Sequence, residues 1–138
     1  MSTTTGSCAC GEIKYEFVGE PINTAFCYCR DCQKHTNSDK WFGAWVPKDT
    51  FSFIQGTPNT YQRIGDSGKS VTHYFCGDCG TTLAGFVEVA QFYSVAATTI
   101  DNNDALKPNM LIYTAHAKDW AVFPDGVPKF DILPPNLG

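Results

Sequence analysis

Cys76-Gly77-Asp78-Cys79 is one of three cysteine clusters in this sequence, and the other two are Cys8-Ala9-Cys10 and Cys27-Tyr28-Cys29-Arg30-Asp31-Cys32. Together they contain all seven cysteines of the 138-residue chain. Two thiolates one or two residues apart can bind one metal ion, because a tight turn points both sulfurs the same way. Cysteines this close rarely reach disulfide geometry without strain, and an odd number cannot all pair. The pattern therefore predicts zinc sites.

Two groupings of the seven thiols are compatible with this spacing. In the first, the outer four form one closed site and the central three share a second zinc: Cys8, Cys10, Cys76 and Cys79 in one, Cys27, Cys29 and Cys32 in the other. In the second, Cys29 and Cys32 join Cys76 and Cys79 as an ordinary zinc ribbon, and three thiols are left over. We favour the first grouping, because it uses every thiol and ties the N-terminal segment to the middle of the chain.

The two sites of the first grouping have different expected roles. A four-thiolate zinc is structural and does no chemistry. A three-thiolate zinc leaves one position for water, a substrate thiol or a local side chain, and His35, three residues after Cys32, is the local candidate. If His35 bound zinc, this site would be closed too and the protein would be a binding module. We favour the open site, because three local thiolates already strain one turn.

The composition is typical of a single globular domain over residues 1–138, with 43% apolar residues and 14% aromatic residues. A formal net charge of −4 argues against a nucleic-acid-binding protein, because phosphate binding needs a dense basic face. No apolar run approaches the ~20 residues of a membrane span, and the first six residues lack the features of a secretory signal. We therefore expect a cytoplasmic protein in a reducing setting, where thiol clusters are more often metal sites or reactive sites than disulfides.

Alternating and apolar runs predict eight or so short strands and almost no helix. The predicted strands cover residues 12–18, 23–28, 41–46, 51–54, 60–64, 70–75, 81–89, 92–100 and 110–116. The polar stretch 30–40 predicts a short helical turn that carries Cys32, and residues 65–68 predict a hairpin turn. The last prolines, Pro124, Pro128, Pro134 and Pro135, predict a wrapping tail with little regular structure. Together these patterns predict an all-β domain that is stabilised by zinc.

Residues outside the cysteine clusters carry weaker signals. Period two places Trp41 and Trp45 on one face of a strand, where core packing is the first expectation. His73 and His116 are expected to be packed or surface histidines. Lys34, like Arg30, flanks the three central thiols in sequence and could contact a carboxylate or polarise a carbonyl.

The cysteine motifs resemble those of the glutathione-dependent formaldehyde-activating enzymes, whose wider superfamily includes centromere protein V. Three segments carry the resemblance, namely residues 6–11 (GSCACG), 27–34 (CYCRDCQK) and 75–83 (FCGDCGTTL), and it continues into residues 116–120 and 125–130. The resemblance implies a small β-tent fold. It also implies structural zinc on the outer four cysteines and catalytic zinc on Cys27, Cys29 and Cys32. This sequence has Tyr28, Gln33 and Asn37 where family members usually carry His, a basic residue and Gly.

The function that this resemblance implies is zinc-dependent carbon–sulfur lyase or synthase chemistry, similar to that of S-(hydroxymethyl)glutathione synthase. Such an enzyme adds or removes a thiol, glutathione or a similar one, at an electrophilic carbon. The expected catalytic residues are Cys27, Cys29, Cys32 and Arg30, and Lys34 or Tyr28 could also assist an oxyanion. Two alternatives stay open: a non-catalytic zinc-binding interaction module, and an enzyme whose zinc activates water for a lyase or hydratase reaction on a non-thiol metabolite.

Overall fold

The chain forms ten short strands and one α-helix in this computed structural model, which describes residues 2–134. The strands are β1 Thr3–Ser7, β2 Lys14–Val18, β3 Asn23–Cys27, β4 Trp41–Pro47, β5 Phe51–Gln55, β6 Asn59–Ile64, β7 Ser70–Phe75, β8 Thr82–Val87, β9 Phe92–Ala96 and β10 Met110–Ile112. The helix α1 spans Arg30–Thr36, and 3-10 helices span Lys48–Thr50, Ala97–Thr99 and Thr114–His116. The predicted all-β class with very little helix is confirmed.

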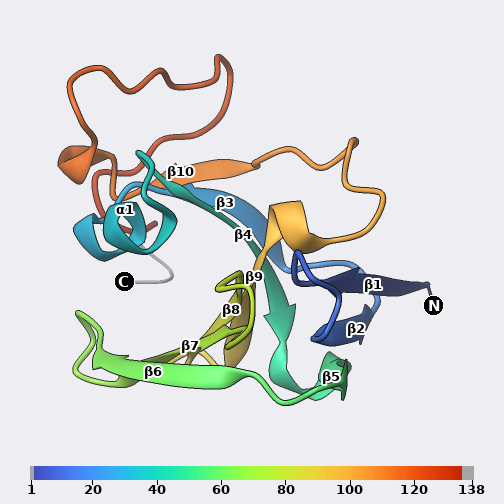
Figure 1. Cartoon of the computed structure of the whole chain (residues 1–138). Helices are drawn as coiled ribbons and strands as arrows, with labels where there is room; N and C mark the ends of the chain where they lie inside the picture. The colour runs from blue at the N-terminus through green and yellow to red at the C-terminus, as the bar shows by residue number, and fades with distance from the viewer. Residues whose placement is uncertain (1, 135–138) are drawn as a thin grey trace.

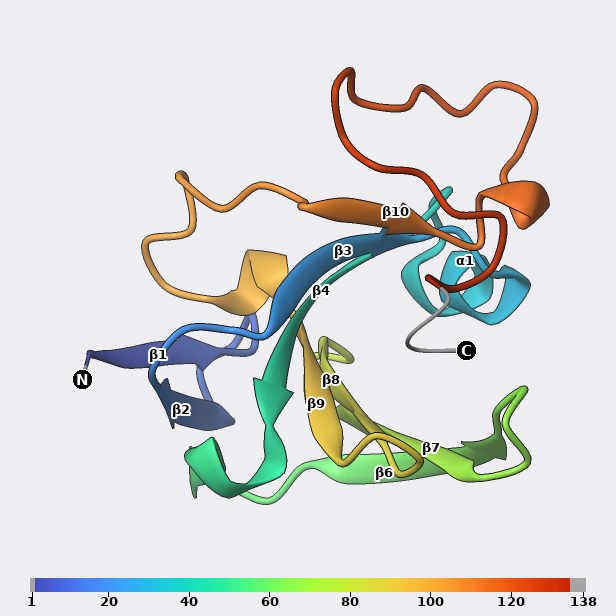
Figure 2. The same cartoon turned by 180° about the vertical axis from the view of Figure 1, so that it is seen from behind.

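The strands form two sheets. The larger has seven strands in the order β10-β3-β4-β9-β8-β7-β6, and the smaller has the order β1-β2-β5. Neighbouring strands are antiparallel except for β10, which runs parallel to β3. Figures 1 and 2 show that the larger sheet is strongly curved, so that α1 and the turn of the β6–β7 hairpin lie on the same side of the molecule. The smaller sheet lies at the other side.

The main core lies between the smaller sheet and one face of the larger sheet. Alternation along β2 turns Tyr15 and Phe17 inward, and both side chains are fully buried. The ring of Phe51 on β5 stacks on Tyr15 with centroids 5.3 Å apart and on Tyr93 with centroids 4.3 Å apart. Cys8 and Cys76 belong to this core. The outer cysteines therefore lie where the two sheets meet.

A second, smaller core lies on the other face of the larger sheet. Trp45 stacks on Phe92 with ring centroids 4.8 Å apart and is buried, as expected of a core tryptophan. Phe130 and Leu133 of the C-terminal segment pack against this cluster. The segment that follows residue 116 has no strand or helix up to residue 134, as predicted, and Pro135 lies outside the described residues. No helix within residues 2–134 is both long and apolar enough to cross a membrane.

One strand is missing from the sequence prediction, and two predicted strands end earlier than expected. Thr3–Ser7, which lacks an alternating apolar pattern, forms β1 because its backbone pairs with β2. The strand predicted over 92–100 ends at Ala96, where the Thr99 hydroxyl donates to the Ala96 carbonyl (2.7 Å) and closes a 3-10 turn. The strand predicted over 110–116 ends at Ile112, because Tyr113 adopts a left-handed conformation (φ 55°) that extended chain does not allow.

Candidate metal centres

The outer cysteines converge into one group, which we call the four-thiol cluster: Cys8, Cys10, Cys76 and Cys79. Their four sulfurs lie within 4.8 Å of one another. The Sγ of Cys10 lies 3.7 Å from that of Cys8 and 3.8 Å from that of Cys76. A tetrahedral zinc with Zn–S bonds of about 2.3 Å requires sulfurs about 3.8 Å apart. The donor set and its spacing therefore fit zinc.

Two glycine-containing turns bring these sulfurs together. Gly11 and Gly80 follow the two cysteine pairs with φ angles of 82° and 79°, a conformation that glycine adopts without steric cost. Backbone bonds close both turns, from Gly11 N–H to the Cys8 carbonyl (3.1 Å) and from Gly80 N–H to the Cys76 carbonyl (2.8 Å). Positive-φ glycines and backbone hydrogen bonds therefore define the local form of both turns.

Hydrogen bonds in the four-thiol cluster favour the thiolate form of Cys79 and Cys8, whereas desolvation and the neighbouring sulfurs outweigh a backbone bond at Glu12 and raise the pKa of Cys10 to about 12. The Thr81 hydroxyl lies 3.2 Å from the Cys79 sulfur, and together with the Thr81 backbone N–H it lowers the pKa of Cys79 to about 5. The pKa of Cys8 is also lowered, although burial opposes the shift, because Ile13 N–H donates to its sulfur (3.3 Å). Metals bind the thiolate form, so this environment suits a metal site.

The central cysteines form a second group, the three-thiol cluster of Cys27, Cys29 and Cys32, whose sulfurs also lie within 4.8 Å of one another. Cys27 ends β3, and Cys29 caps α1, where its sulfur accepts the Cys32 N–H (3.3 Å). The sulfurs of Cys29 and Cys32 are 2.9 Å apart, so bound zinc would require them to separate by about 1 Å. Three soft donors on one short turn fit a zinc site with an open position.

The charge in the three-thiol cluster centres on Cys29. Side-chain hydrogen bonds with the sulfurs of Cys27 and Cys32, a bond from the Cys32 N–H and the positive charge of Arg63 lower the pKa of Cys29 to about 2, although burial opposes the shift. The same contact raises the pKa of Cys27 to about 12. Cys29 is therefore a thiolate at neutral pH. None of the seven cysteines forms a disulfide.

The structure groups the thiols as the first grouping has it, and the ribbon grouping does not form. Cys29 and Cys32 gather with Cys27, while Cys76 and Cys79 gather with the N-terminal pair. His35 does not join the three-thiol cluster. Its ring instead stacks on that of His73, with centroids 4.0 Å apart. Among the described residues, no histidine, cysteine or carboxylate supplies the central cluster with a fourth donor.

Side chains from the β6–β7 hairpin pack onto α1 beside the three-thiol cluster. Arg63 on β6 pairs with Asp31 of α1 (3.4 Å), and its Nε donates to Nε2 of His73 on β7 (3.2 Å). Tyr61 lies 5.9 Å from the His35 ring, centroid to centroid. The sequence predicts only a packed or surface histidine at position 73 and contains no motif that marks Arg63. The sequence does indicate that Tyr61 and Arg63 share one face of a predicted hairpin strand, because they lie two residues apart.

A second contact ties the hairpin turn to the end of β10. The hydroxyl of Tyr113 donates to the carboxylate of Asp66, with 2.9 Å between the oxygens. Burial and the Asp66 carboxylate raise the pKa of Tyr113, with smaller contributions from the charges of Cys27 and Cys29. Tyr113 is therefore a protonated hydroxyl near the three-thiol cluster, and its left-handed backbone places it there.

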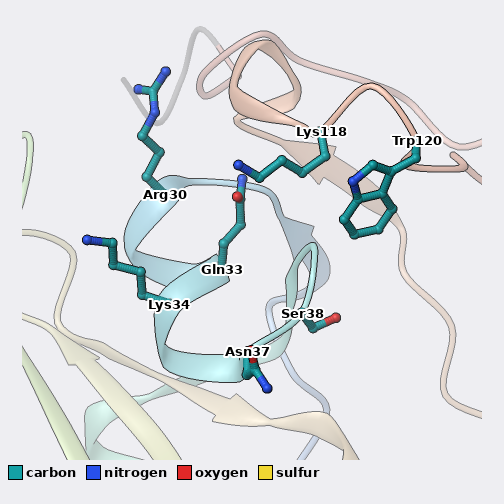
Figure 3. A pocket seen from close by; sticks show the side chains of 7 residues that line it. All are labelled: Arg30, Gln33, Lys34, Asn37, Ser38, Lys118 and Trp120. Carbon is teal, nitrogen blue, oxygen red and sulfur yellow. The ribbon is translucent and has the colours of Figure 1, made fainter.

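The other residues with a predicted catalytic role are Arg30, Lys34 and Tyr28. Arg30 and Lys34 line a groove beside α1 (Figure 3), and the catalytic role of Arg30 stays a prediction. Tyr28 is fully buried, with its ring against Phe26 and Phe123.

Two departures from the usual family residues have a structural explanation. Asn37 caps α1 in the left-handed conformation (φ 52°), where glycine is the commonest residue and asparagine is tolerated. Gln33 is buried, and its amide donates to two backbone carbonyls, those of Tyr28 (2.8 Å) and His116 (3.0 Å).

Comparisons with known proteins give the family and a similar fold. The family model described as "glutathione-dependent formaldehyde-activating enzyme" matches residues 3–116, which include all seven cysteines. The chain belongs to this family. A crystal structure of a Rhodobacter sphaeroides protein, a structural-genomics target, is similar in fold with a TM-score of 0.57. It shares 19% sequence identity, and the match covers 71% of this chain and 88% of that one. No protein of curated function matches the sequence.

Proposed function

We propose that the three-thiol cluster binds a catalytic zinc ion and that the protein adds a thiol such as glutathione to an electrophilic carbon such as that of formaldehyde, or catalyses the reverse cleavage. The observation that carries this proposal is the unequal donor count of the two clusters. The four-thiol cluster has the four donors of a closed structural site, whereas Cys27, Cys29 and Cys32 have three. Family membership supports the thiol and aldehyde chemistry.

Zinc bound there would supply a soft Lewis-acidic centre that accepts a fourth sulfur and favours its thiolate form. The remaining functions fall to the protein. Cys27 and Cys29 lie on either side of the β3–α1 junction and would hold the ion in place. The positive charge of Arg63, fixed by Asp31, offsets the negative charge that accumulates on the sulfurs. Tyr113 presents a protonated hydroxyl from a third segment.

The proposed reaction is balanced without any further reactant. The substrate sulfur forms a bond to the carbonyl carbon, and the carbonyl oxygen takes up the proton that the thiol has lost. Because little covalent chemistry is required of the protein, its main contribution is to hold the two reactants at the correct distance and orientation. A reducing compartment such as the cytoplasm would keep the seven thiols free for this role.

The test measures the zinc content of the protein and the rate at which it forms the thiol adduct. Protein purified with zinc should contain two ions per chain by native mass spectrometry. With glutathione and formaldehyde at equilibrium, exchange NMR should then show faster conversion to S-(hydroxymethyl)glutathione than buffer alone. A panel of other thiols and aldehydes defines the true substrate if this pair is a poor one. If fully zinc-loaded protein accelerates none of these thiol additions, the proposed chemistry is wrong.

A further inference from the structure

We propose that a groove on the opposite side of α1 from His35 binds a small planar acid, that is, an aromatic ring that carries a carboxylate or a phosphate. The groove measures about 560 Å³ and lies between α1 and the loop after residue 116 (Figure 3). We call it the basic groove, after the three cations that line it, Arg30, Lys34 and Lys118. Arg30 and Lys34 also have a sequence-predicted role in the thiol chemistry, but the other lining residues do not, and the inference does not require that chemistry.

The basic groove and the three-thiol cluster use different faces of one helix. Residues 30, 33, 34 and 37 follow the spacing that places side chains on one helix face, and all four line the groove. Cys32 and His35 lie on the opposite face, toward the β6–β7 hairpin. A ligand in the groove would therefore contact α1 without contacting the sulfurs.

Among residues 2–134, no acidic side chain forms an ion pair with Arg30, Lys34 or Lys118. Its lining contains no acidic residue, although the chain carries a net charge of −4. The two nearest acids in sequence to the helix residues are engaged elsewhere, Asp31 with Arg63 (3.4 Å) and Asp39 with Lys40 (3.1 Å). Cations that lie together without a counter-ion repel one another, and a bound anion relieves this repulsion.

A buried amide fixes the two walls of the groove relative to each other. Gln33 is 9% exposed, and its amide donates to the Tyr28 carbonyl (2.8 Å) at the end of β3 and to the His116 carbonyl (3.0 Å) at the start of the loop. Lys118 lies two residues after His116 in the chain, and Figure 3 shows its side chain extended toward Gln33. The backbone segments that carry the helix and loop cations are therefore held relative to each other before a ligand arrives, which lowers the entropic cost of binding.

The groove also offers a surface for a ring. Trp120 lines it and is 68% exposed, an unusual environment for the largest apolar side chain. An indole face stacks favourably on another aromatic ring. Ligand pockets commonly measure about 300–1,000 Å³, so the groove suits a one- or two-ring molecule. An acid group on that ring would meet Lys118, whose side chain extends from the loop between Trp120 and Gln33 in Figure 3, while the ring covers Trp120.

The test uses 2-naphthoate and 2-naphthyl phosphate as probes, with uncharged 2-naphthamide and inorganic phosphate as controls. Binding is followed by the indole N–H signals of the three tryptophans in ¹H–¹⁵N spectra, and Trp120→Phe assigns its signal. We expect both acids to shift the Trp120 signal saturably, and both controls to bind at least about tenfold more weakly. Whichever acid binds more tightly shows whether the site prefers a carboxylate or a phosphate.

Matched variants separate a specific site from general charge attraction. Lys118→Gln and Lys34→Gln should each weaken naphthoate binding about fivefold or more. Lys69→Gln removes the same charge from the hairpin turn and should change it less than twofold. The inference is overturned if naphthamide binds as well as naphthoate, if inorganic phosphate binds as well as naphthyl phosphate, or if all three variants lose affinity equally. Spectra of the free variants that match the parent spectrum exclude unfolding as the cause of any loss.

Discussion

The imidazole rings of His35 and His73 stack with their centroids 4.0 Å apart and their planes inclined by 23°. His35 belongs to α1 and His73 to β7, so this contact joins the helix of the three-thiol cluster to the hairpin opposite it. Arg63 donates its Nε–H to Nε2 of His73. Burial, with the added charges of His35 and Arg63, lowers the pKa of His73 to about 4, and the charge of Cys29 acts weakly in the other direction. The stack therefore depends on a neutral His73.

This dependence predicts a loss of stability in mild acid. Between pH 6.5 and about 4 the unfolded chain binds a proton at His73 and the folded chain does not, so folding becomes less favourable as the pH falls. Because the ring is partly exposed, we expect roughly 1–2 kcal/mol from this group. Urea unfolding at several pH values between 7 and 4.5 measures the slope.

His73→Gln is the control for this prediction, because it keeps a polar side chain that does not titrate. Both proteins carry the same seven thiols, so any loss of metal in acid affects them alike, and the difference between their slopes isolates His73. Equal slopes in the two proteins would show that the stack does not exclude the proton.

A second prediction concerns the contact between the hairpin turn and the end of β10. Tyr113→Phe removes the hydroxyl that donates to Asp66 (2.9 Å) and keeps the ring. We expect a loss of about 1 kcal/mol in the free energy of unfolding, since a hydrogen bond to a carboxylate is stronger than a neutral one but this pair is exposed. Amide hydrogens around residues 65–69 should also exchange faster. Asp66→Asn completes a double-mutant cycle, and strictly additive effects would mean that the bond contributes nothing.

The fold class and the presence of metal-type thiol pairs follow from local sequence patterns, whereas two groupings of the thiols fit the spacing and the fold brings together only one of them. Alternation in β2 and the turn at 65–68 are local signals, and thiols have few other uses at this spacing. The features that the sequence does not predict depend on contacts between residues that are distant in the chain. Thr3–Ser7 becomes a strand only because β2 pairs with it, and Arg63 comes to lie near Cys29 only through the curvature of the sheet. Arg30 follows Cys29 directly, yet helical geometry turns its side chain into the basic groove.

A third prediction tests the structural role of the four-thiol cluster. Cys76→Ser should unfold or aggregate the protein, because zinc binding contributes folding free energy directly, with apparent values of ~10 kcal/mol or more in small zinc peptides. Cys76 is also buried in the main core, next to thiols from the start of the chain. Soluble yield and thermal unfolding are the measurements. A soluble variant with the melting curve of the parent would show that this cluster does not stabilise the fold.

The last prediction separates the two clusters. Cys29→Ser should fold with nearly the parent Tm, retain one zinc ion and lose the other. Cys27, Cys29 and Cys32 lie within six residues, so a metal there closes only a small loop and restricts little chain entropy. Serine is also a favourable helix N-cap, so its hydroxyl can accept the Cys32 N–H as the Cys29 sulfur does (3.3 Å) and α1 should persist.

Metal analysis, thermal unfolding and the exchange-NMR assay should be applied together to Cys29→Ser. Thiol addition should fall to the uncatalysed rate while the fold and the remaining zinc are unchanged. Cys29→Ala provides a further comparison, because it also removes the helix cap and should lose roughly 1 kcal/mol more stability than the serine variant. If the Tm of Cys29→Ser falls as far as that of Cys76→Ser, the three-thiol cluster is structural and an interaction module becomes the better description. If it folds and keeps full activity, catalysis takes place elsewhere on the chain.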